Sequence, residues 1–164
     1  MLASTTIFLV LVTAPAQAQT QAVAAREDLA KAVQIAQSLE SEPLGKQAKD
    51  QRAWLMLWLI EVPDVTVKAC SHLLGPLVES KKNYSSELLA QMLGSSAAFI
   101  ISNPDKSKDD VAVYAAGLKG SLRAYESILK IKPKAGWPFL DDLIEKRTKG
   151  ELTEFVRQAA VQCK

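Results

Sequence analysis

The chain contains 164 residues, of which 48% are hydrophobic and 23% are charged. This composition is too apolar for a disordered chain and too charged for a bundle of membrane helices, and the length fits one domain. Lysine and arginine number 20 against 18 aspartates and glutamates, and the resulting net charge of +2 excludes the strongly basic surface expected of a nucleic-acid-binding protein.

Residues 1–18 (MLASTTIFLVLVTAPAQA) differ in composition from the rest of the chain. They contain no charged side chain, have an apolar centre from Ile7 to Val12, and end in AQA, with small residues at the two positions that a signal peptidase reads. We therefore predict a secretory signal peptide that is cleaved before Gln19. A retained anchor is the alternative, but the apolar stretch is shorter than the roughly 20 residues that a membrane span needs.

Residues 19–164 are predicted to form a single exported domain, periplasmic or extracellular, with no membrane span after cleavage. In this part apolar residues recur at helical spacing, and prolines and glycines separate the segments. The connections are short, which favours antiparallel hairpins, so we predict an all-α fold of six or seven helices. The segments expected to be helical are residues 22–41, 45–62, 64–74, 85–102, 108–131, 139–147 and 151–164, and no strand is expected.

The longest apolar run of the predicted domain extends from Ala53 to Ile60. Because a helix that is apolar on all sides normally lies inside a protein, we predict that this helix is the centre of the core. Trp54 and Trp58 lie four residues apart and share one face of it. A ligand-stacking role for this tryptophan pair is the alternative interpretation.

Cys70 and Cys163 are the only cysteines, and in an exported protein we expect them to form a disulfide bond between the C-terminal helix and an early helix. Two buried thiols or a redox pair are the alternatives, although no C-x-x-C motif supports the latter. His72 is the only histidine and follows Cys70 and Ser71. On a helix these neighbours point in different directions, so we predict neither a catalytic triad, nor a metal site, nor a cofactor.

The sequence GSLRAYESILKIKP, residues 120–133, resembles the second helix of a tetratricopeptide repeat. Such helices carry a small residue, then an aromatic, an aliphatic and a closing proline, which here fall on Ser121, Tyr125, Ile128 and Pro133. The resemblance covers this segment alone, and it implies an architecture of helical hairpins.

For function, we predict a non-enzymatic binding or interaction module of the cell envelope, with a groove near Trp54 and Trp58 or near Tyr114 and Tyr125. The two tyrosines are spaced by three helical turns and therefore share one side of their helix. The expected partner is another envelope protein or a peptide.

Two other interpretations stay open. The sequence contains no phosphate-binding glycine loop, no G-x-S-x-G and no H-E-x-x-H motif, so we assign no catalytic residue. A small secreted hydrolase is the alternative, with Glu61, Asp64 or Asp141 brought together by the fold. A purely structural envelope protein without a ligand is the third interpretation.

Overall fold

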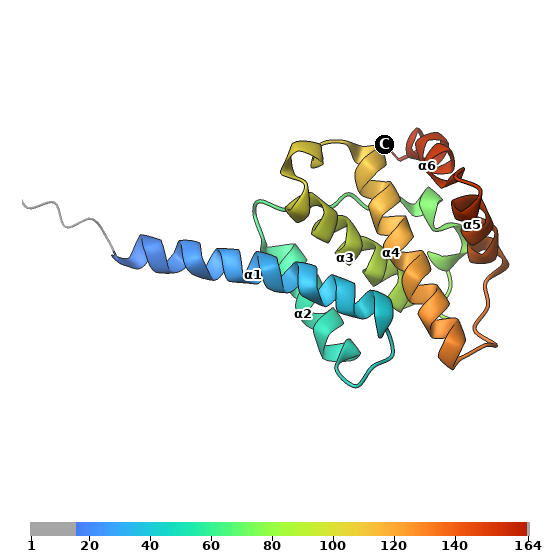
Figure 1. The fold of residues 1–164 in the computed structure, drawn as a ribbon, viewed down its shortest axis with the longest axis horizontal. Coiled ribbons are helices and arrows are strands. Elements are labelled where there is room, and N and C mark those ends of the chain that lie inside the picture. Colours follow the sequence, from blue (N-terminus) through green and yellow to red (C-terminus); the bar gives the residue numbers. More distant parts are fainter. Residues whose placement is uncertain (1–15, 164) are drawn as a thin grey trace, which may run out of the picture.

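The computed structural model describes the backbone of residues 16–163 and the side chains of residues 26–163. Within this range the chain forms six α-helices and no strand, which confirms the predicted all-α fold (Figure 1). The helices are α1 (Ala16–Ser41), α2 (Ala48–Glu61), α3 (Ser85–Ser102), α4 (Asp110–Ile131), α5 (Pro138–Thr148) and α6 (Leu152–Ala160), with 3₁₀ turns η1 (Ser71–Leu73), η2 (Gly75–Leu77) and η3 (Pro104–Lys106).

The predicted signal peptide lies mostly outside the described residues, which begin at Ala16. Helix α1 starts there and continues through the predicted cleavage position before Gln19. Among the helices described, none is both long and apolar enough to cross a membrane.

Helices α3 and α4 form an antiparallel hairpin at the centre of the molecule (Figure 1). Small residues allow the two backbones to approach closely, since a Cβ atom at Gly117 would lie 2.7 Å from the carbonyl oxygen of Met92. Two hydroxyls cross the interface: Ser121 donates to the carbonyl of Leu88 at 2.9 Å, and Ser96 donates to that of Val113 at 3.3 Å. The segment that resembles a tetratricopeptide helix forms the second half of α4.

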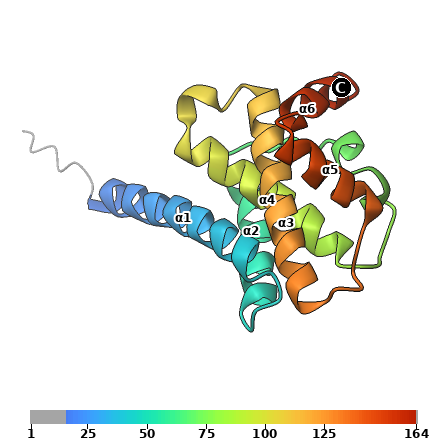
Figure 2. The ribbon, with the colours of Figure 1, turned by 45° about the vertical axis from the view of Figure 1, so that its right-hand side comes forward.

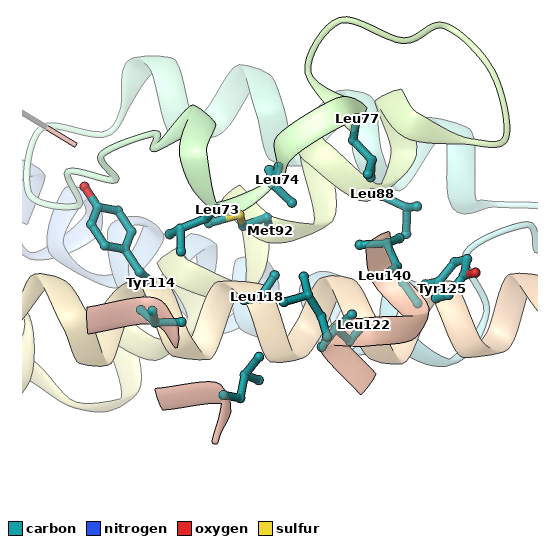
Figure 3. Close-up of a cluster of buried hydrophobic side chains, with 14 of the residues drawn as sticks. Leu73, Leu74, Leu77, Leu88, Met92, Tyr114, Leu118, Leu122, Tyr125 and Leu140 are labelled. Carbon is teal, nitrogen blue, oxygen red and sulfur yellow. The ribbon is translucent and has the colours of Figure 1, made fainter. Parts of the chain in front are cut away.

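The largest hydrophobic cluster fills the side of this hairpin that faces α5 and α6 (Figures 2 and 3). Helix α4 contributes fully buried side chains at the spacing of one helical face, and α5, α6 and the two turns η1 and η2 close over them. Its fully buried members include Leu73, Leu77, Leu88, Leu118, Leu122, Tyr125, Ile128, Leu140, Leu143 and Val156.

Helix α2 is not the central core helix that the apolar run predicted. Only Ala48 and Leu55 are buried along it, whereas Leu57 is 61% exposed and Ile60 is 81% exposed. It pairs with α1 and contacts α3 on one side only, and no other element of the described chain covers its outer face. The prediction was wrong because an apolar helix is buried only where other elements pack around it, and α1 and α3 leave the outer face of α2 uncovered.

The helix predicted at residues 64–74 is also wrong. Cys70 has extended backbone angles, and only the short turns η1 and η2 follow it. The β-branched residues Val65, Thr66 and Val67 disfavour a helix, and burial of Val65 against Ala97 and Ile100 stabilises the extended path.

Helix α4 begins two residues later than predicted. Residues Ser107 to Asp110 match a capping box with Ser107 as the predicted N-cap. The N-cap is Asp109, whose carboxylate accepts a hydrogen bond from the amide of Ala112 at 3.0 Å. The Ser107 hydroxyl donates instead to the carbonyl of Pro104. The prolines that were expected to delimit helices do so, with Pro138 in the first turn of α5.

The predicted disulfide bond between Cys70 and Cys163 is present, with the two Cα atoms 5.3 Å apart. It joins the segment before η1 to the residues that follow α6. The bond closes a loop of 93 residues that contains α3, α4, α5 and α6.

Candidate functional site

Trp54 and Trp58 lie on the surface hairpin of α1 and α2. Their rings are stacked, with centroids 6.0 Å apart and planes inclined by 11°. The ammonium group of Lys31 lies 4.0 Å from the centre of the Trp54 ring, a cation–π contact that ties α1 to α2. Both tryptophans are half-buried, so part of each ring is used in packing this hairpin.

Tyr114 and Tyr125 lie on the core face of α4, with only 2% and 0% of their surfaces exposed. The hydroxyl of Tyr125 donates to the carboxylate of Asp141 at 2.7 Å and accepts a hydrogen bond from the amide of Trp137 at 2.7 Å. Burial raises the pKa of Tyr125 to about 12, and the contact with Asp141 acts in the same direction. These rings therefore pack the core and do not line an open groove (Figure 3).

A groove of about 600 Å³ lies between α1, α3 and α4, with one residue each from η3 and α6 at its edge. Its apolar part consists of Phe99 and a set of alanines, whose short side chains leave the space unfilled. Its polar part contains serine, asparagine, lysine and arginine side chains. The groove residues are Gln37, Glu40, Ser95, Ala98, Phe99, Ser102, Asn103, Lys106, Ala112, Ala115, Ala116, Lys119, Arg123 and Thr153.

One end of the groove is fixed by Glu40. Its carboxylate accepts a bidentate pair of hydrogen bonds from the Arg123 guanidinium at 2.7 and 2.8 Å and a third hydrogen bond from the Ser95 hydroxyl at 2.7 Å. The charge of Arg123 is thereby balanced. Lys106 and Lys119 form no ion pair with a carboxylate among residues 26–163, so the groove carries an excess of positive charge.

Two of the three acidic residues considered for catalysis lie together. Glu61 and Asp64 line a hollow of about 290 Å³ next to Trp58, with Asp28 as a third carboxylate. All three acids are solvent-exposed, whereas a carboxylic acid that acts as a proton donor at neutral pH normally lies in a shielded site. Asp141 lies elsewhere, on α5, where it holds Tyr125.

Cys70, His72 and Cys163 also come together, whereas the helix predicted at residues 64–74 would keep Cys70 and His72 apart. The backbone is extended at Cys70 and turns at Ser71. As a result, the two sulfur atoms and an imidazole nitrogen all lie within 4.8 Å of one another. The predicted separation was wrong because it assumed a helix, on which side chains two residues apart point in different directions.

The groove residues were missed from the sequence, although a signal was present. Ala112, Ala116, Lys119 and Arg123 follow the spacing of one helical face, on which small residues are followed by two cations. On α4 this face of small residues and cations lies beside the face of buried core residues. Such a pattern predicts a helix whose buried face packs against its neighbours while the face of small residues leaves a groove. No family model, no curated protein and no solved structure matches this chain.

Proposed function

We propose that the protein is an exported, non-enzymatic binding module whose ligand site is the groove between α1, α3 and α4, and whose partner is a peptide segment rich in carboxylates. The observation that carries the proposal is the groove of about 600 Å³ with two lysines that form no ion pair within residues 26–163. Export stays a prediction from residues 1–18.

The shape of the groove supports a peptide as the partner. Ala98, Ala112 and Ala116 provide a floor without protruding side chains, and Phe99 offers an aromatic surface for an apolar residue. Ser102 and Asn103 lie where α3 ends and present hydrogen-bonding groups to a backbone. A mixture of apolar floor and polar rim is typical of sites that hold a short segment of chain.

The charges support an acidic partner. Lys106 reaches the groove from η3 and Lys119 from α4, so a chain laid along the groove meets both ammonium groups. Exposed charges act mainly on the association rate and on specificity, and their effect weakens with salt. The proposal therefore includes a salt-dependent affinity.

A secreted hydrolase is the second candidate, because Glu61 and Asp64 do share a hollow with Asp28. Their exposure argues against it, as does the position of Asp141 on α5, where its carboxylate accepts a hydrogen bond from the Tyr125 hydroxyl. The distinguishing measurement is hydrolysis of chromogenic glycosides and esters by the protein and by Glu61→Gln. Turnover that Glu61→Gln abolishes would replace the binding proposal.

The binding proposal is tested with fluorescently labelled octapeptide pools of three kinds, acidic, basic and uncharged, by anisotropy at low and high salt. We expect the acidic pool to bind most tightly and to weaken as salt rises. Lys119→Glu should lower the affinity about fivefold or more, since it reverses a charge at the site. Lys130→Glu, the same reversal on an exposed residue of α4 outside the groove, should leave it unchanged.

Two results would contradict the proposal. One is equal binding of the three pools, and the other is an equal effect of the two charge reversals. If no pool binds at all, the interpretation as a structural envelope protein without a ligand is favoured instead.

A further inference from the structure

We propose that the reduced form of this protein binds one thiophilic cation, with zinc as its representative, through Cys70, Cys163 and His72. The inference does not depend on the proposed groove. It begins from one observation: three side chains from two distant parts of the sequence place two sulfurs and one imidazole nitrogen within 4.8 Å of one another.

The surrounding packing holds these groups together independently of the disulfide bond. Helix α6 is anchored by Leu152 and Val156, which are 2% and 0% exposed and belong to the same cluster as Leu73 and Leu74 beside Cys70. After reduction these apolar contacts remain. The Cα atoms of the two cysteines, now 5.3 Å apart, therefore stay close enough for both sulfurs to reach one ion.

The environment of the three groups suits a metal site. Cys70 is 4% exposed and Cys163 is half-buried, so the thiolates are partly shielded from water. His72 is exposed, so the site is open to solvent on this side and an ion can enter there. Two thiolates and one imidazole are a zinc-ligand set, and a water molecule completes tetrahedral coordination.

The two forms exclude each other because the disulfide bond occupies both sulfurs. A dithiol reductant supplies two electrons and two protons, the S–S bond breaks, and the reductant itself becomes a disulfide. Zinc then displaces the two thiol protons and forms two Zn–S bonds while the imidazole donates a lone pair. In the reverse direction, a small-molecule disulfide accepts two electrons from the two thiolates and is cleaved to its thiols, the Cys70–Cys163 bond forms again, and the ion is released.

The test uses the whole protein, reduced, freed of reductant under anaerobic conditions and titrated with Co²⁺ as a spectroscopic substitute for zinc. We expect one equivalent to bind, with the visible absorption of tetrahedral thiolate coordination, and zinc to displace it. The oxidised protein should give no such absorption. Zinc should also protect both thiols of the reduced protein from a thiol reagent, and a chelator should remove this protection.

His72→Ala should weaken Co²⁺ binding about tenfold or more, since loss of even an outer-shell partner of a metal costs 10- to 100-fold. Ser71→Ala, an exposed neighbour, is the matched control and should bind as the unchanged protein does. If reduction lowers the helical circular dichroism, zinc should restore it. Equal binding by the oxidised protein or by His72→Ala would overturn the proposal, as would unfolding on reduction without recovery in zinc.

Discussion

The hairpin of α1 and α2 and the hairpin of α3 and α4 differ in burial in the opposite sense to what the apolar run in α2 suggests. Helix α2 contains the most apolar run of the domain, yet it lies at the periphery of the molecule (Figure 1). Its residues Leu57 and Ile60 are exposed. Helix α4 has no uninterrupted apolar run of that length, yet it is buried along most of its length between α3 on one side and α5 and α6 on the other (Figure 2).

The difference in burial follows from how the side chains are arranged on each helix and not from the length of its apolar run. Gly117 and Gly120 bring α4 within direct contact of Ser95 and Ser96 on α3, and this close approach lets the neighbouring leucines interlock. Helix α2 has no glycine, and of its residues that pack against neighbouring elements only Ala48 and Leu55 are buried. A helix can therefore lie at the centre of the fold only if several of its faces pack closely against neighbouring helices.

The largest effect is expected from removing the disulfide bond, which closes the loop of 93 residues that contains α3 to α6. The double variant Cys70→Ala, Cys163→Ala should lose about 4–5 kcal/mol of unfolding free energy, the chain-entropy value for a loop of about 100 residues. Urea unfolding followed by circular dichroism measures it. A loss below about 1 kcal/mol would mean that the reduced chain is already restrained.

The same truncation in the two hairpins should have very different costs. Leu122→Ala on α4 removes a fully buried side chain and should cost about 3 kcal/mol, whereas Leu57→Ala on α2, 61% exposed, should cost less than about 0.5 kcal/mol. Urea unfolding of both variants gives the comparison. Similar costs at the two positions would show that α2 is buried after all.

A methyl group at Gly117 tests the close approach of α3 and α4. It would collide with the Ser96 hydroxyl and the Met92 carbonyl, so Gly117→Ala should lose about 1–2 kcal/mol even after the gain of about 1 kcal/mol in helix propensity. Gly136→Ala is the control, because its Cβ would meet nothing closer than 3.8 Å. Thermal unfolding of the pair should separate them; a stabilised Gly117→Ala would refute the close-packing argument.

The smallest effect concerns Tyr125, which fastens α5 to α4. Its pKa is raised from 10.0 to about 12, first by burial, so the folded state keeps a proton that the unfolded state has released. Its contribution is complete below pH 10 and is lost as the pH rises from 10 toward 12. The free energy of unfolding of Tyr125→Phe should be about 1 kcal/mol lower at neutral pH and should fall less steeply as the pH rises above 10. Urea unfolding at a series of pH values measures both proteins, and the same dependence on pH for Tyr125→Phe and the unchanged protein would contradict this.

Much of the fold follows from the sequence because its signals are local. Proline positions and helical periodicity located α2 to α5 to within three residues at each end, whereas α1 begins earlier and α6 ends earlier than predicted. The two cysteines were correctly predicted to pair. The extended path at residues 65–70 was missed because it depends on burial of Val65 against α3, a contact distant in sequence. The groove and the group of Cys70, His72 and Cys163 were missed for the same reason, since each combines residues from separate elements.

Native-state hydrogen exchange of individual amides tests the central claim, that α4 and not α2 is the core of this domain. Amides from Val113 to Ile128 in α4 should exchange only through global unfolding, with the same free energy that urea unfolding gives. Amides from Trp54 to Ile60 in α2 should exchange through local opening at a clearly lower free energy. Protection in α2 equal to or greater than that in α4 would contradict this account.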